Sequence, residues 1–262
     1  MTFQFKPAVR ESVGLIIGLA GSTGSGKTYS AMRLASGIAG KKKFAVIDTE
    51  AGRAKHYADQ FNFDHGDLKP PFEPKAYSEA IAAADQAGYP VIVVDSVSHI
   101  WAGDGGMLEL QEKELARLGG HNAVKLLSWA KPKAEHKRFV ARLLQLRAHL
   151  ILCFRAEPKI EMRLNEKTGK MEIVEKHSSA GYHGWMPICE KTLPYELTTS
   201  FMMMSEDPGI PLAIKLQEQH RGIFKKGELL SEDAGKRISA WAAGETFVKA
   251  PVERVKKTEV TI

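Results

Sequence analysis

The sequence predicts an α/β domain with a mostly parallel central sheet, and three observations support this fold class. Four short runs are apolar at nearly every position, as strands buried on both faces require: residues 13–20, 44–47, 91–94 and 150–154. Helical patterns lie between some of these runs, and a glycine-rich turn joins the first run directly to the first helical pattern. Fully buried strands that alternate with helices are typical of parallel sheets covered on both sides.

The elements are predicted in chain order from local patterns. The first strand leads into a helix over residues 27–38, because apolar residues recur there at helical spacing until Gly40 ends the pattern. The following elements are strands at 44–48 and 91–95, a helix at 134–147, strands at 150–154, 196–204 and 211–217, and a helix at 231–243. Residues 156–184 differ, because lysine, glutamate and glycine alternate there. We predict a hairpin or mobile loop for this segment.

Length and composition limit the class of protein. A chain of 262 residues with 44% hydrophobic and 26% charged residues is an ordinary globular sequence. We predict one domain over residues 1–244, with a mobile loop at about 157–185, and a basic, disordered tail over 245–262.

The two cysteines exclude a disulfide framework and a four-cysteine zinc site, so a reduced, cytoplasmic chain is expected. No apolar run reaches the roughly 18 residues of a membrane span, and no secretory cleavage pattern is present, so no membrane partner is predicted. The net charge of +6 favours a polyanionic partner, and nucleotide, nucleic acid and simple solubility all fit it.

A phosphate-binding loop is the strongest signal in the chain. The loop matches the pattern G-x-x-x-x-G-K-[ST] without substitution, with Gly21, Ser22, Thr23, Gly24, Ser25, Gly26, Lys27 and Thr28. Glycines let consecutive backbone N–H groups face a phosphate at the N-terminus of a helix. Lys27 is expected to reach the β- and γ-phosphates of ATP, and Thr28 to place its hydroxyl on Mg²⁺.

Two further strand ends carry carboxylates suited to the same site. Asp95 closes the strand at 91–95, where it can hold the metal, and capping of the next helix is the alternative. Asp48 and Glu50 follow the strand at 44–48. Glu50 can orient water toward a γ-phosphate, or Glu50 or Asp48 can simply cap the next helix. Spacing alone does not separate these two roles.

The order of these motifs resembles the RecA-like recombinase core. The phosphate-binding loop is followed by Asp48-Thr49-Glu50 and then by Asp95-Ser96-Val97, as in that family. Residues 154–157 and 184–187 look more narrowly like the bacteriophage single-strand annealing (Sak-type) ATPases and the phage nucleotide-binding proteins. The resemblance implies a three-layer RecA-like P-loop NTPase in the cytoplasm of a bacterial host. It also implies ATP and Mg²⁺ as cofactors and slow, DNA-stimulated hydrolysis in which Glu50 activates water. The partners it implies are single-stranded DNA in recombination, further copies of the chain in a ring or filament, and a single-strand-binding protein.

This sequence departs from the RecA pattern at two positions. The strand at 150–154 is followed by Arg155, where the family usually has a polar residue that senses the γ-phosphate, so Arg155 is a candidate phosphate sensor. Glutamines stand about where RecA supplies lysines across the subunit interface, and Lys215 and Arg221 are the candidate replacements.

Two basic segments are candidate nucleic-acid contacts. Residues 131–147 read as an amphipathic helix whose basic face either is simply solvated or follows a polynucleotide backbone. The loop at 157–185 combines cations with aromatic residues, although its acids nearly cancel the charge. The other function classes that the sequence allows are a P-loop kinase of a nucleotide or small molecule, and a switch that binds ATP without hydrolysing it.

Overall fold

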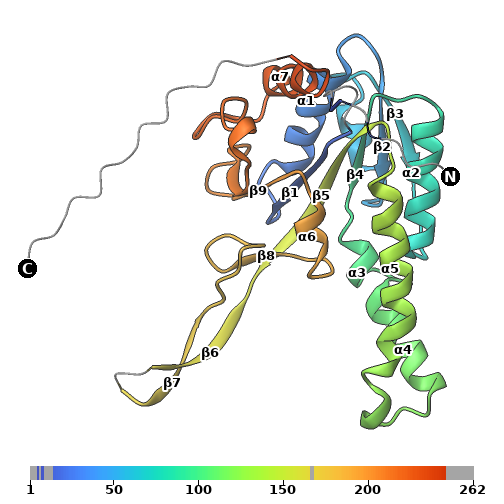
Figure 1. The fold of residues 1–262 in the computed structure, drawn as a ribbon, viewed down its shortest axis with the longest axis vertical. Helices are drawn as coiled ribbons and strands as arrows, with labels where there is room; N and C mark the ends of the chain where they lie inside the picture. The colour runs from blue at the N-terminus through green and yellow to red at the C-terminus, as the bar shows by residue number, and fades with distance from the viewer. Residues whose placement is uncertain (1–4, 6, 9–13, 166–167, 246–262) are drawn as a thin grey trace, which may run out of the picture.

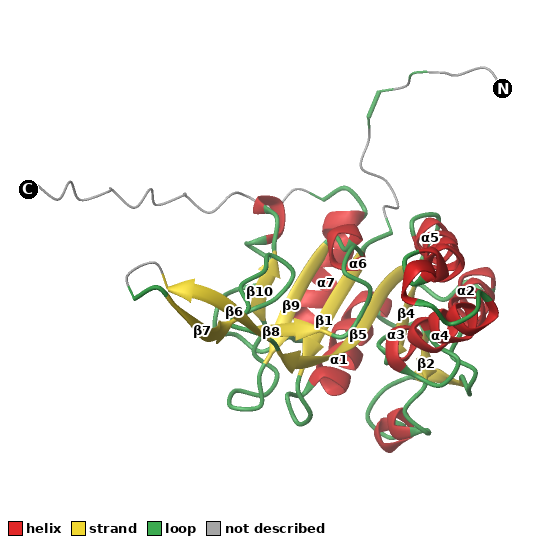
Figure 2. Cartoon of the chain, turned by 90° about the horizontal axis from the view of Figure 1, so that it is seen from below, coloured by secondary structure: helices red, strands yellow, loops and turns green. Residues whose placement is uncertain are grey.

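The computed structural model describes residues 5, 7–8, 14–165 and 168–245. The predicted tail lies, from residue 246 on, outside the described residues. The domain is built on a central sheet with the strand order β10-β9-β1-β5-β4-β2-β3, in which every neighbouring pair is parallel except β10 and β9 (Figure 2). The strands are β1 (Ile16–Gly21), β2 (Phe44–Asp48), β3 (Phe63–Asp67), β4 (Val91–Asp95), β5 (His149–Pro158), β9 (Thr199–Met203) and β10 (Leu212–Lys215).

Helices cover both faces of this sheet, so the domain has three layers (Figure 1). Alternate strand residues enter two separate hydrophobic cores, as the pleat requires. In β1, Ile17 and Leu19 pack with α1 (Lys27–Ala39) and α7 (Glu232–Ala242), whereas Ile16 and Ala20 face the second core. That second core includes residues of α2 (Pro74–Gln86), α3 (His99–Ala102), α5 (Ala130–Leu143) and the first residue of α4 (Met107–Arg117). The fold is that of a RecA-like P-loop NTPase, as predicted.

The helix predicted at 134–147 lies four residues earlier in the chain. It begins at Ala130 and ends at Leu143. The backbone N–H groups of Arg147 and Ala148 donate to Asp85 Oδ1, at 3.2 and 2.8 Å, which holds this segment out of the helix and leads it into β5. Leu144, the first residue after the helix, is 57% exposed.

The segment after β5 forms an arm that leaves the body of the domain (Figure 1). The antiparallel strands β6 (Ile160–Asn165) and β7 (Lys170–Glu175) make a hairpin, and β8 (Trp185–Pro187) returns to pair with the end of β5. The short helix α6 (Leu193–Glu196) then leads back to β9. In the described part of the chain, no helix combines the length and apolarity needed to span a bilayer.

Candidate nucleotide-binding site

The phosphate-binding loop connects β1 to α1, and its glycines are required by geometry. Gly24 and Gly26 have φ values of 79° and 78°, in the left-handed region that disfavours other residues. Gly21 lies so close to β9 that a Cβ atom would stand 2.2 Å from the carbonyl oxygen of Met203. The tip of the loop, at Thr23 and Gly24, is exposed.

Polar groups inside the loop are arranged for an anion. Lys27 Nζ donates to Ser22 O at 2.6 Å and to Ser25 Oγ at 3.3 Å, and no carboxylate of the described residues forms an ion pair with it. Burial lowers the pKa of Lys27, while the nearby acids, Asp95 and Glu50 among them, act to raise it. Ser22 Oγ is buried without a hydrogen-bond partner. A cationic amine and an unpaired hydroxyl in a loop at a helix N-terminus fit a bound phosphate chain.

Asp95, at the end of β4, lies against the first turn of α1. Thr28 Oγ1 donates to Asp95 Oδ2 at 2.5 Å, and the Asp95 carboxylate forms no capping bond to the short helix that follows. Burial raises the pKa of Asp95, and the bond from Thr28 opposes this shift. A hydroxyl and a buried carboxylate side by side are the hard oxygen donors that Mg²⁺ prefers, so these residues fit the metal.

Asp48 and Glu50 have different roles in the structure. The Asp48 carboxylate accepts the backbone N–H groups of Glu50 and Ala54, at 2.6 and 2.8 Å, and so caps the 3₁₀ helix η1 (Arg53–Tyr57). It also lies 3.3 Å from His65 Nε2. Because Asp48 satisfies these backbone groups, Glu50 is not used as a cap.

The Glu50 side chain instead meets basic side chains at the edge of the site. Arg155 holds it in a two-pronged ion pair, with N···O distances of 2.7, 2.8 and 2.9 Å. Arg53 and His99 lie 3.6 and 3.8 Å from its carboxylate oxygens. The Glu50 side chain is 11% exposed and that of Arg155 is 50% exposed.

His99 is a site residue that the sequence did not reveal. Its Nδ1 lies 2.8 Å from Thr49 Oγ1, and burial and Arg155 lower its pKa, which favours the neutral ring. Thr49 also accepts the N–H of Ser96, so it ties the end of β2 to the end of β4. The only signal in the sequence was the position of His99, four residues after Asp95.

The expected strand end at Arg155 is wrong, because β5 continues to Pro158. From Ala156 on, β5 no longer pairs with β1. It pairs instead with β8, and Ala156 lies opposite Pro187. Arg155 therefore lies inside a strand, where its backbone N–H donates to Ser98 Oγ at 2.9 Å. Its side chain pairs with Glu50.

The two candidate intersubunit residues have partners within the chain. Lys215 Nζ donates to the carbonyl oxygens of Tyr195 and Leu197, at 2.7 and 2.5 Å, and so joins β10 to α6. Arg221 forms an ion pair with Glu218 at 3.0 Å, and its side chain is 66% exposed. Of the two, Arg221 is the more accessible to another subunit.

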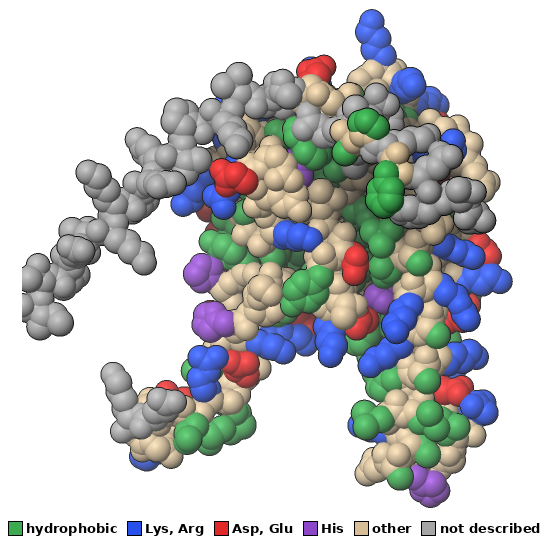
Figure 3. All heavy atoms as spheres, viewed as in Figure 1, with side chains coloured by type: hydrophobic (Ala, Val, Ile, Leu, Met, Phe, Trp, Pro, Cys, Tyr) green, Lys and Arg blue, Asp and Glu red, His purple; other side chains and the backbone are tan. Residues whose placement is uncertain are grey.

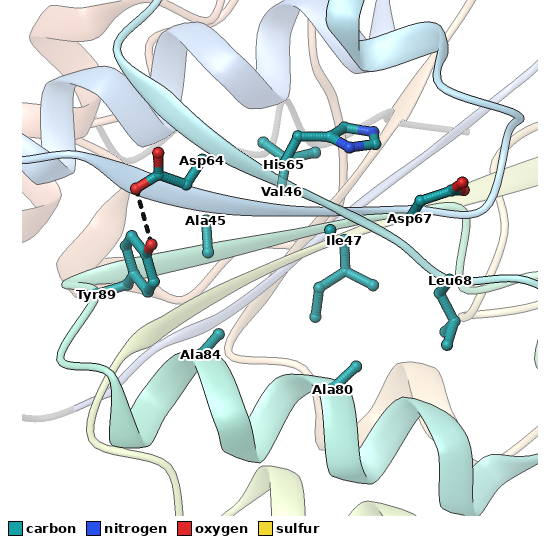
Figure 4. A pocket seen from close by; sticks show the side chains of 11 residues that line it. Ala45, Val46, Ile47, Asp64, His65, Asp67, Leu68, Ala80, Ala84 and Tyr89 are labelled. Carbon is teal, nitrogen blue, oxygen red and sulfur yellow. Dashed lines mark hydrogen bonds between the residues drawn. The ribbon is translucent and has the colours of Figure 1, made fainter.

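Two of the hollows outside this site are relevant here. One, of about 310 Å³, lies between α2 and the β2–β3 edge of the sheet, because the small residues Ala80 and Ala84 face it from the helix (Figure 4). Of the two aspartates that line it, Asp64 is already bonded to Tyr89 and Lys43. The other, of about 580 Å³, lies at the base of the hairpin. Its lining includes three lysines and two aromatic residues: Lys159, Lys176, Lys191, Trp101 and Tyr195.

The fold and the site together define a P-loop ATPase: a RecA-like sheet, a phosphate-binding loop, and carboxylates on the ends of β2 and β4. Residues 14–186, well over half of the chain, match a protein-family model described as an AAA domain, and the chain belongs to this family. No curated protein matches the sequence. Among solved structures, it is similar to a KaiC-like protein from the hyperthermophilic archaeon Pyrococcus horikoshii OT3. The identity is 16%, over 66% of this chain and 89% of that chain, with a TM-score of 0.34.

Proposed function

We propose that the chain hydrolyses ATP slowly with Mg²⁺, using Glu50 to orient the attacking water. Lys27 would bind the β- and γ-phosphates, and Thr28 and Asp95 would hold the metal. When bound, Mg²⁺ supplies positive charge that stabilises the phosphates in the transition state.

This proposal rests on the different roles of Asp48 and Glu50 in the structure. Asp48 caps η1 by accepting two backbone N–H groups. Glu50 is therefore the carboxylate at the end of β2 that is not bonded to the backbone of the described residues. Glu50 pairs with Arg155, which lies opposite Gly21 of the phosphate-binding loop in the β1–β5 pairing, so its carboxylate lies near the loop. A general base must stand within reach of the water that it orients, and this position is suited to that role.

Phosphate release with ATP and Mg²⁺ tests the activity. We expect turnover that EDTA abolishes and that Lys27→Ala also abolishes, because the cation on the phosphates is lost. ATP at 100 times its Kd should also stabilise the wild-type protein by about 2.7 kcal/mol, and Lys27→Ala should lose this effect. Turnover by Lys27→Ala at the wild-type rate would show that the loop is not the active site.

We further propose that the chain binds single-stranded DNA and promotes annealing or strand pairing in phage recombination, as an oligomer on the DNA. The hollow at the hairpin base supports DNA binding, because lysines pair with phosphates while aromatic rings stack with bases. Figure 3 shows Lys and Arg side chains along the notch between the hairpin and helices α4 and α5. Continuity of β5 with the hairpin would couple DNA binding to the ATP site.

Fluorescence anisotropy of a labelled oligonucleotide, with and without ATP–Mg²⁺ and at two salt concentrations, tests DNA binding. We expect salt-sensitive binding that weakens in Lys159→Ala and Lys191→Ala. In each variant the slope of the logarithm of the binding constant against the logarithm of salt concentration should be smaller in magnitude by about one. Lys75→Ala, on α2 and outside this hollow, is the matched control. No binding by the folded, ATP-binding protein would refute this proposal and leave the ATPase assignment intact.

The kinase alternative receives less support from the site. A kinase would need arginines that close over a second phosphate acceptor. Among the described residues, the two arginines next to the site, Arg53 and Arg155, both face Glu50.

A further inference from the structure

The hairpin β6–β7 has one face made almost entirely of apolar side chains. The residues that point to this face alternate along each strand, and the register places them opposite one another: Met162 opposite Ile173, and Leu164 opposite Met171. Ile160 continues the face toward the base of the hairpin. The opposite face carries Glu161, Arg163, Asn165, Lys170 and Glu172, with Val174 as its single apolar residue. The hairpin is therefore an amphipathic ribbon.

No described residue covers the apolar face. Its five side chains belong to residues that are 54–69% exposed: Ile160, Met162, Leu164, Met171 and Ile173. Figure 3 shows hydrophobic side chains on the projecting arm at the lower left, which Figure 1 identifies as this hairpin. A two-stranded hairpin is marginally stable in water unless its apolar face packs against something. The face is thus a surface that requires a partner.

The chemistry of the face points to protein rather than nucleic acid. It has no aromatic ring on which a base could stack and no lysine or arginine for a phosphate. Its only charged residue is Glu175, at the base opposite Ile160, where the side chain lies against Gly184. The cations and aromatic rings that suit DNA lie instead in the hollow at the hairpin base.

We propose that this face binds the same face of a second copy of the chain. A two-fold interface joins identical patches, which must not carry like charges at their centre, and this face meets that requirement. From these exposed fractions the five residues expose roughly 600 Å², so two copies would bury at most roughly 1,200 Å² together, the lower limit of a standard stable interface. Two such ribbons can stack face to face about 10 Å apart, as in packed sheets.

Sedimentation velocity from 1 to 100 µM, without nucleotide or nucleic acid, tests this dimer. We expect a concentration-dependent monomer–dimer equilibrium for the wild-type protein. The double variant Met162→Lys/Ile173→Lys should raise the dimer Kd by about 100-fold or more, because it places unpaired charges at the centre of the interface. The matched control Arg163→Glu/Glu172→Arg exchanges two oppositely charged residues that lie opposite one another on the other face of the same hairpin, and it should leave the dimer unchanged. A cooperative thermal unfolding transition near the wild-type melting temperature confirms that each variant is folded.

Cross-linking tests the same dimer without disrupting its interface. Ile173→Cys should form a covalent dimer under mild oxidation, whereas Glu172→Cys, on the polar face, should not. A wild-type protein that is monomeric at 100 µM would overturn the proposal, as would equal loss of dimer in both double variants. Binding of that monomer to vesicles in flotation would assign the face to a membrane instead. The dimer is measured without ATP or DNA, so its failure does not bear on the proposed ATP hydrolysis or DNA binding.

Discussion

Replacing Glu50 with glutamine tests the proposed mechanism most directly. Glutamine keeps the size and one acceptor oxygen of the side chain but cannot act as a base. Loss of a general base typically lowers a rate by 10²- to 10⁴-fold, which corresponds to about 3 to 5 kcal/mol of lost transition-state stabilisation. We therefore expect kcat for ATP hydrolysis to fall by that factor while ATP binding persists.

The effect of Glu50→Gln on stability should be much smaller. The Arg155 side chain is half exposed, so water and salt screen its ion pair with Glu50. Loss of such a pair costs about 1 kcal/mol or less, and the melting temperature should fall by no more than about 4 °C. Steady-state phosphate release, the affinity for a fluorescent ATP analogue and thermal unfolding measure the three quantities separately.

Arg155→Gln is the matched control, because it breaks the same ion pair from the other side. If Arg155 contacts phosphate, this variant should weaken ATP binding and raise KM while it retains much of kcat. Glu50→Gln should do the reverse. A Glu50→Gln protein with kcat within threefold of wild type would refute the role of Glu50 in hydrolysis. Equal losses in both variants, with no further loss in the double variant, would mean that the pair only supports the structure.

Two further predictions concern stability. Burial lowers the pKa of His149, whose Nδ1 accepts a backbone N–H, so stability is full above its ordinary pKa and declines as pH falls through the lower folded value. Denaturant titrations from pH 8 to 5 should show this decline, and His149→Gln should reduce it. Gly37→Ala should cost about 1 to 3 kcal/mol, because its Cβ would stand 2.0 Å from the carbonyl oxygen of Glu232 in α7. Gly222→Ala, where a Cβ meets nothing within 4 Å, is the control, and equal melting temperatures for the two variants would contradict the reasoning.

The sequence was most informative where one residue type serves one local purpose. Runs such as Val91–Asp95 are buried on both faces, so their composition alone predicts a central strand. The phosphate-binding loop is equally local, because its glycines are required by its own backbone. These two kinds of signal sufficed to predict the parallel sheet and the turn between its first strand and the first helix.

Other features depend on partners that are distant in the chain. Strand β3 reads Phe-Asp-His-Gly-Asp, which has no apolar alternation, and it is a strand because it lies at the edge of the sheet beside β2. The true end of β5 depends on β8, about thirty residues later. Asp48 and Glu50 are equivalent by residue type, and only the position of the Ala54 N–H separates the cap from the carboxylate that faces the site.

Strand β5 is the element that joins these observations. It lies between the phosphate-binding strand β1 and the Asp95 strand β4, where Cys153 is opposite Asp95. Two residues later Arg155 holds Glu50, and three residues after that the strand ends at Pro158, next to the hairpin. A phosphate that draws Arg155 away from Glu50 would act on the backbone immediately before the hairpin base. We therefore expect hydrogen exchange at residues 156–160 to change with ATP in the wild-type protein and not in Arg155→Gln.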